Sequence, residues 1–145
     1  MKITSPVLFI LGSALVTVAA YASLGAQQPA SVMAGVYTDA QAKRGEKVYA
    51  DNCATCHGPK LQGTDTAGPT LSGPDFVNGW KDMTVAALFA KISSDMPSNA
   101  PGSLKPEEYA DVLSFVLATN KYPAGKSELP PDPAALKGVK MAAPK

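Results

Sequence analysis

The sequence predicts an all-α fold, and three observations support this prediction. Residues 39–52 and 85–93 each follow a threonine that can cap a helix. Residues 106–119 repeat apolar side chains at the period of an α-helix. The other stretches are punctuated by glycine and proline, which number 12 and 13 among 145 residues and disfavour strands. Apolar residues make up 46% of the chain, enough for one buried core.

The first helix is predicted over residues 39–52. Thr38 and Gln41 have the spacing of a capping box, and good helix formers follow them. Gly45 lies inside this helix, where glycine costs on the order of 1 kcal/mol relative to alanine. We therefore expect another helix to approach closely there, on the face that Tyr49 shares; a tolerated surface glycine is the alternative.

The helix runs into the motif Cys53-Ala54-Thr55-Cys56-His57. Two thiols three residues apart lie on one face of a helical turn, so both can form thioether bonds to one porphyrin. The histidine that follows can bind the iron. Three alternatives are less favoured. A redox dithiol would need a βαβ context, and a disulfide would leave His57 unexplained. A structural zinc site needs four ligands, whereas the chain has two cysteines and one histidine. The motif predicts one covalently bound haem c.

Residues 58–81 are predicted to be a loop that wraps the porphyrin. Glycine and proline recur throughout this stretch, which argues against long helices. The carbonyl of Pro69 is a candidate to accept a hydrogen bond from His57, because a metal-bound imidazole usually donates its other N–H. Trp80 is expected beside the haem with its N–H toward a propionate, or else as an ordinary core tryptophan.

The last helix is predicted to begin with Pro106, a residue suited to the first helical position. Phe115 should lie beside its apolar face and meet Gly45 and Tyr49 of the first helix. The proline-rich tail, residues 124–145, is expected to lie extended over the surface or to be partly disordered.

Methionine is the obvious candidate for a second axial ligand, because its thioether is a soft donor and His57 is the only histidine. Met96 is the preferred candidate, since it lies in a loop made rigid by Pro97 and Pro101. Met83, just before the predicted helix 85–93, is the rival. Met33 and Met141 lie before the first helix and in the tail.

Residues 1–26 are predicted to be a secretory signal peptide, followed by a leader over residues 27–37. Lys2 precedes an apolar run and small residues, and cleavage after Ala22 or Ala26 fits the small-x-small rule. An uncleaved anchor is the alternative. Both place the domain in the periplasm or facing it. The formal net charge of +1 gives no sign of nucleic-acid binding.

Residues 38–122 resemble a monohaem class I cytochrome c, on the haem motif, Gly68-Pro69, Met96-Pro97 and Phe115. The resemblance implies a cytochrome c fold, in which the N- and C-terminal helices of a domain at 38–123 cross. It also implies axial ligation by His57 and Met96, with the Pro69 carbonyl accepting from His57. One departure is Lys105, where a capping serine or threonine is expected.

The stretch from Met96 to Gly125 is similar to cytochromes that accompany pyrroloquinoline-quinone (PQQ) alcohol dehydrogenases. This implies a periplasmic one-electron carrier, not an enzyme, that accepts electrons from a PQQ-type dehydrogenase and passes them to a terminal oxidase or another cytochrome. A fixed cytochrome subunit of a dehydrogenase complex is the alternative, and a ligand-binding or peroxidatic haem protein is a further one. Membrane contact is expected only if the leader stays uncleaved.

Overall fold

The computed structural model describes residues 29–65 and 67–144, so the predicted signal peptide lies outside the described residues. The helices are η1 Val32–Ala34, α1 Asp39–Asn52, α2 Ala54–His57, α3 Gly73–Trp80, α4 Val85–Asp95, α5 Pro106–Thr119 and α6 Pro133–Leu136. Isolated β-bridges occur, but the described part of the chain has no strand, which confirms the all-α prediction. None of the helices in these residues combines the length and hydropathy needed to cross a membrane.

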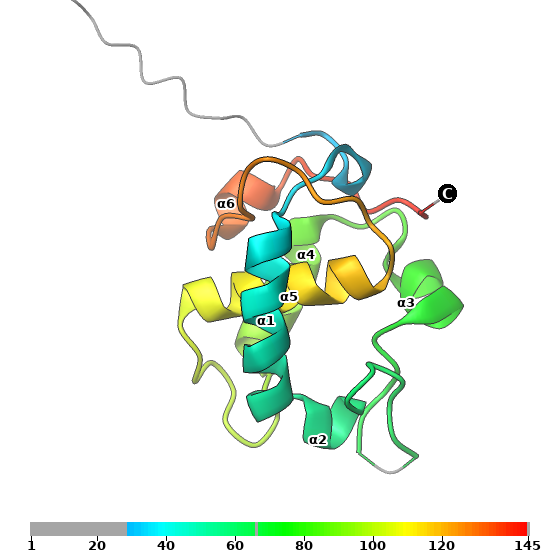
Figure 1. Ribbon diagram of the computed structural model, residues 1–145, viewed down its shortest axis with the longest axis vertical. Coiled ribbons are helices and arrows are strands. Elements are labelled where there is room, and N and C mark those ends of the chain that lie inside the picture. The colour runs from blue at the N-terminus through cyan, green and yellow to red at the C-terminus, as the bar shows by residue number, and fades with distance from the viewer. Residues whose placement is uncertain (1–28, 66, 145) are drawn as a thin grey trace, which may run out of the picture.

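Helices α1 and α5 cross at close range (Figure 1). A Cβ atom on Gly45 would lie 1.8 Å from the carbonyl oxygen of Asp111 in α5, so only glycine allows the two backbones to approach this far. The rings of Tyr49 and Phe115 pack beside the crossing, with centroids 5.3 Å apart. The close approach predicted at Gly45 and the predicted contact of Phe115 with Tyr49 are confirmed.

The starts of the long helices follow from local capping. The Thr38 hydroxyl accepts from the Gln41 N–H at 3.1 Å, and the Thr84 hydroxyl accepts from the Ala87 N–H at 3.2 Å. Helices α1 and α5 have their predicted bounds, and α4 continues two residues beyond the prediction, to Asp95. At α5 the carboxylate of Glu108 accepts from the backbone N–H of Lys105 at 2.8 Å. This bond satisfies one N-terminal donor where Lys105 offers no side-chain acceptor.

Helix α3 corrects the prediction that residues 58–81 are loop throughout. It spans eight residues, with a proline in its first turn and an acidic residue, Asp75, near its N-terminus. Proline is suited to the start of a helix, because the N–H that it lacks has no intrahelical partner there. The Gly73-Pro74 pair therefore begins a helix instead of excluding one.

The tail also differs from its prediction. Residues 126–141, here called the C-terminal strap, are ordered and fold back over the N-terminal end of α1 and over α4 (Figure 1). The strap buries four apolar side chains: Leu129, Leu136, Val139 and Met141. Gln41 fixes it with two hydrogen bonds to the backbone of Leu129, donating from Nε2 at 3.0 Å and accepting at Oε1 at 2.7 Å.

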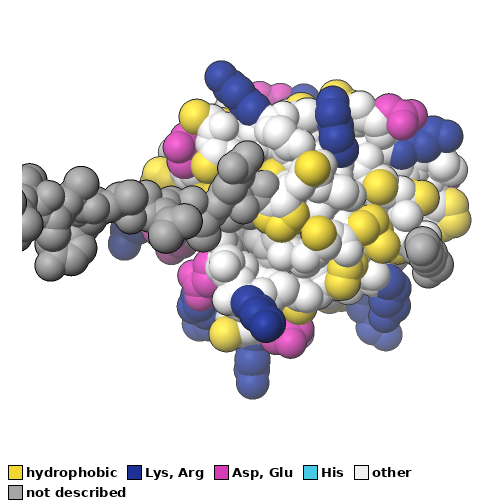
Figure 2. Space-filling view, turned by 90° about the horizontal axis from the view of Figure 1, so that it is seen from above, with side chains coloured by type: hydrophobic (Ala, Val, Ile, Leu, Met, Phe, Trp, Pro, Cys, Tyr) yellow, Lys and Arg dark blue, Asp and Glu magenta, His cyan; other side chains and the backbone are white. Residues whose placement is uncertain are grey.

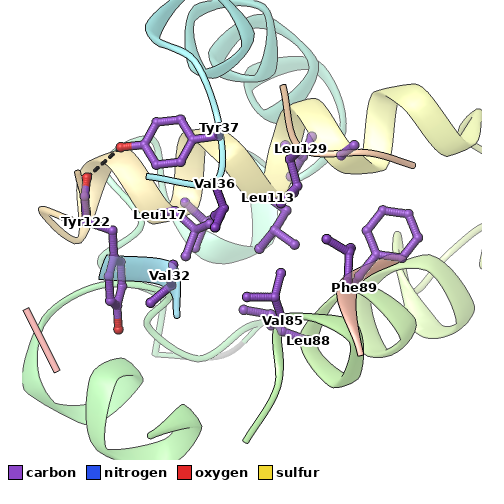
Figure 3. Close-up of a cluster of buried hydrophobic side chains, with 14 of the residues drawn as sticks. Val32, Val36, Tyr37, Val85, Leu88, Phe89, Leu113, Leu117, Tyr122 and Leu129 are labelled. Atoms are coloured by element: carbon purple, nitrogen blue, oxygen red, sulfur yellow. Dashed lines mark hydrogen bonds between the residues drawn. The ribbon is translucent and has the colours of Figure 1, made fainter. Parts of the chain in front are cut away.

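The residues just before α1 belong to the same core. Val32, Val36 and Tyr37 are almost completely buried and point among side chains of α4, α5 and the strap (Figure 3). The strap pairs with this segment where the Val32 N–H donates to the Lys140 carbonyl at 2.9 Å. Seen from this end of the molecule, lysines and carboxylates are interspersed with apolar side chains, and no broad area carries a single sign of charge (Figure 2).

Candidate haem site

The haem motif lies at the end of α1. Cys53 follows the last residue of that helix, and α2 contains the other four residues of the motif. The N–H groups of Cys56 and His57 donate to the Cys53 carbonyl at 3.1 and 2.9 Å, so the motif forms a single helical turn. Both cysteines are half-buried and neither is in a disulfide.

Burial, with a smaller contribution from Cys56, raises the pKa of the Cys53 thiol to about 11. The thiol is therefore protonated at neutral pH, whereas a redox dithiol requires a cysteine whose pKa is lowered toward or below neutrality. This environment of Cys53 disfavours the redox-dithiol alternative.

His57 is buried, and its ring is oriented by one backbone contact. Its Nδ1 lies 2.8 Å from the carbonyl oxygen of Pro69, which is the pairing expected from the sequence. When Nδ1 carries the proton and donates to this carbonyl, Nε2 keeps a free lone pair, as a metal ligand must. Gly68 makes the approach possible, because a Cβ there would lie 3.0 Å from Nδ1 and 2.9 Å from the Cys56 carbonyl oxygen.

Met96 is the C-cap of α4, and its side chain is half-buried. Its carbonyl accepts a 2.6 Å hydrogen bond from the hydroxyl of Tyr109 and a 3.3 Å bond from the N–H of Gly102. The rival, Met83, has a side chain that is 43% exposed, and its carbonyl accepts from Met141 of the strap. The structure thus gives Met96 an anchored loop and places Met83 beside the strap.

Several apolar side chains near the motif and on α3, α4 and the loop before α5 are only partly covered. They pack on the core but remain partly accessible: Cys53, Ala54, Leu71, Trp80, Ile92 and Leu104. Trp80 ends α3, with its ring 6.5 Å from that of Phe76, and the contact with a propionate stays a prediction. These features fit a haem c group: two thiols, an imidazole with a free Nε2, a thioether and partly uncovered apolar side chains.

Sequence reasoning missed two tyrosine hydroxyls. That of Tyr49 donates to the Gly58 carbonyl, next to His57, at 2.7 Å, and that of Tyr109 donates to Met96. Burial raises the pKa of Tyr49 to about 12, so its hydroxyl is a donor throughout the neutral range. The helical period indicated that both rings would be buried, but nothing local signals which carbonyl each hydroxyl reaches.

A shallow surface depression between α1 and α5 contains none of these residues. Arg44 lies in it and donates to both carboxylate oxygens of Asp111 at 2.9 Å and to Glu128 at 2.9 and 3.0 Å. The hydrogen bond to Asp111, then that to Glu128, raises the pKa of Arg44. The only arginine of the chain is thus held by carboxylates on the surface.

Comparisons with known proteins agree with this site. Residues 40–116 match the profile of the family described as cytochrome c oxidase, cbb3-type, subunit III. The chain is 32% identical over 102 residues to a thiosulfate dehydrogenase of Stutzerimonas stutzeri (strain A1501), covering 66% of this chain and 30% of that protein. It is 32% identical over 98 residues to the cbb3-type cytochrome c oxidase subunit CcoP of Rubrivivax gelatinosus, covering 66% of this chain and 31% of that protein.

This chain therefore spans under a third of the length of either of these relatives. Among solved structures, the sulfane dehydrogenase SoxCD from Paracoccus pantotrophus is similar, with a TM-score of 0.45 and 21% identity over 61% of this chain and 52% of that one. That likeness is too remote to carry an inference.

Proposed function

The chain belongs to the cytochrome c family, because residues 40–116 match the profile of cbb3-type oxidase subunit III, and from this we propose its function. We propose that it is a periplasmic one-electron carrier whose axial ligands are His57 and Met96. Membership of the family implies a covalently bound haem c, and the spacing of Cys53 and Cys56 is that of its attachment motif. The haem supplies the change of oxidation state, and the protein supplies ligands, burial and orientation.

The observation that carries the proposal is the 2.8 Å contact between His57 Nδ1 and the Pro69 carbonyl. It fixes one ring nitrogen and leaves the other available, and such partners also raise the basicity of a ligating imidazole. Met96 offers a soft thioether from an anchored loop. His/Met ligation raises the reduction potential and suits a carrier whose two ligands stay bound in both oxidation states.

A peroxidatic or gas-binding role would need an open coordination position and a polar group beside it. His57 is the only histidine of the chain and is the proposed ligand. Arg44, the only arginine, is bound to Asp111 and Glu128 on the α1–α5 surface. The contacts of these two residues support an electron-transfer protein over an enzyme.

The family supports redox proteins as partners, and we propose which redox proteins these are. We propose a PQQ-type dehydrogenase as donor, from the resemblance of Met96 to Gly125, and a terminal oxidase or another cytochrome as acceptor. The second candidate is a fixed cytochrome subunit. It is favoured by one observation, that the matched relatives are named as a dehydrogenase and an oxidase subunit and are about twice as long.

Optical spectra of the pure oxidised and reduced holoprotein test the ligation. We expect a low-spin spectrum with the weak near-infrared band of an iron–thioether bond, lost in Met96→Ala and kept in the control Met83→Ala. Loss in Met83→Ala instead would transfer the ligand role to Met83. A high-spin spectrum that shifts with carbon monoxide in the unmutated protein would favour the ligand-binding function.

Purification in high salt tests the carrier against the fixed subunit. A carrier should elute alone and be reduced by a purified PQQ dehydrogenase. A second polypeptide that stays bound through high salt would favour the fixed subunit. The N-terminal sequence of the protein from the periplasmic fraction would show whether cleavage occurs after Ala22, after Ala26 or not at all.

A further inference from the structure

Three buried tyrosines donate their hydroxyls to backbone carbonyls, and two of these carbonyls lie at the proposed axial ligands. The rings are at most 4% exposed. The bonds are Tyr37 to Tyr122 at 2.6 Å, Tyr49 to Gly58 at 2.7 Å and Tyr109 to Met96 at 2.6 Å. Gly58 directly follows His57, while the Tyr37 bond reaches Tyr122, just beyond the C-terminal end of α5 (Figure 3).

Tyr109 stands at the base of the loop from Met96 to Leu104. Its ring comes from the beginning of α5, a 14-residue helix that crosses α1. The hydroxyl donates to the Met96 carbonyl at 2.6 Å and accepts from the Leu104 N–H at 3.4 Å. One oxygen atom therefore joins the two ends of the loop to each other and both ends to α5.

We propose that Tyr109 is a positioning residue for Met96, which keeps the thioether in place against competing ligands; this rests on the proposed axial role of Met96. A loop that is rigid before its ligand atom binds loses less conformational freedom on binding, and its ligand is harder to displace. The Tyr109 hydroxyl supplies this rigidity at the backbone of the ligand residue itself, without contacting the iron.

The size of the effect follows from the contacts that would remain. In Tyr109→Phe the ring stays and one hydroxyl is lost. The Met96 carbonyl keeps its 3.3 Å bond from the Gly102 N–H, so the carbonyl is not left without a donor. Loss of one buried hydrogen bond of this kind changes an equilibrium by roughly three- to tenfold. We expect the thioether to be displaced at an imidazole concentration lower by that factor.

The test is an imidazole titration of the oxidised holoprotein, followed by the near-infrared thioether band. Tyr37→Phe is the matched control, because it removes a hydroxyl that donates to a backbone carbonyl at the same 2.6 Å distance, beyond the C-terminal end of α5, whereas Tyr109 lies near the N-terminal end. Urea unfolding is measured for both variants. We expect Tyr109→Phe to lower the imidazole midpoint and Tyr37→Phe to leave it unchanged, even where both variants lose similar resistance to urea.

Equal imidazole midpoints for Tyr109→Phe and the unmutated protein would overturn the positioning role and leave the Met96 ligation intact. A midpoint lowered equally in both variants would also overturn it, since the effect would then follow global stability. Failure of Tyr109→Phe alone to form holoprotein would show a role in the whole fold and overturn it as well. Absence of the thioether band from the unmutated protein would instead overturn the proposed function.

Discussion

Gly45 sets the distance between α1 and α5, so replacing it with alanine should strongly destabilise the protein. The added Cβ would lie 1.8 Å from the Asp111 carbonyl oxygen and 2.4 Å from its carbonyl carbon, whereas ordinary contacts of such a carbon begin near 3.4 Å. The two backbones would have to separate by the difference, 1.6 Å. No side-chain rotation can relieve the clash, because each atom concerned belongs to, or is fixed to, a helix backbone.

The expected cost combines two opposing effects. Overpacking that forces side chains and backbone to shift typically costs about 1–3 kcal/mol, occasionally more, and a separation of two helix backbones lies at or above the upper end of this range. Alanine in place of an interior helical glycine returns about 1 kcal/mol. We expect Gly45→Ala to lower the free energy of unfolding by at least about 2 kcal/mol, a substantial part of the roughly 5–15 kcal/mol that domains possess.

Urea unfolding of the holoprotein, followed by far-ultraviolet circular dichroism, measures this change. Gly79→Ala is the matched control, because Gly79 also lies in a helix, α3, but a Cβ there meets nothing within 4 Å. It should be neutral or stabilising by up to about 1 kcal/mol. If Gly45→Ala changed the free energy of unfolding by less than 1 kcal/mol, the reasoning from the helix crossing would be refuted.

Three further predictions concern single contacts. Gln41→Ala should cost about 2–4 kcal/mol, because the backbone N–H and carbonyl of Leu129 lose their partner, and hydrogen exchange at Leu129 should speed up; unchanged exchange would contradict this. The hydrogen bond from Arg44 lowers the pKa of the half-exposed Glu128, so Glu128→Gln should lower the free energy of unfolding by at most about 1 kcal/mol at pH 7. This loss should vanish as the pH falls through the lowered pKa, which lies below the ordinary glutamate value of about 4.3. A difference in stability that persists at pH 2 would contradict this. Gly68→Ala should move the loop away from the ring of His57 and weaken the hydrogen bond that the ring donates to the Pro69 carbonyl, which should raise the reduction potential. Voltammetry would measure this, and an unchanged or lowered potential would contradict it.

The three long helices could be predicted because their signals are local. Thr38 and Thr84 cap their own helices, and the apolar period of residues 106–119 lies within a single helix. The attachment motif is also local, because its two cysteines and its histidine lie within five consecutive residues. Gly45 could be predicted as a crossing point, because a costly glycine in a helix needs a reason.

Other features depend on partners far away in the sequence. The hydrogen bonds of the Gln41 side chain to the Leu129 backbone join positions 88 residues apart, and the apolar residues of the strap have no regular spacing. The sequence therefore predicts that the tail is a surface segment, although in the structure it completes the core. Helix α3 was missed for a different reason: Gly73-Pro74 is compatible with both a loop and a helix start, and only the following packing of Phe76 decides between them.

The contacts of α5 connect the stability of the helix crossing to the proposed ligand geometry. Helix α1 leads directly into the motif, and α5 holds the Met96 carbonyl through Tyr109. We therefore expect the crossing at Gly45 to set the spacing between His57 and Met96, the two proposed axial ligands. A separation of 1.6 Å at the crossing would change the distance between the two proposed ligands by a comparable amount, because the motif follows α1 and Met96 is held to α5. In Gly45→Ala the thioether band should thus disappear at a lower urea concentration than the helical circular dichroism signal, whereas in Gly79→Ala both should be lost together. Simultaneous loss in Gly45→Ala would mean that the crossing supports the fold without setting the ligand spacing.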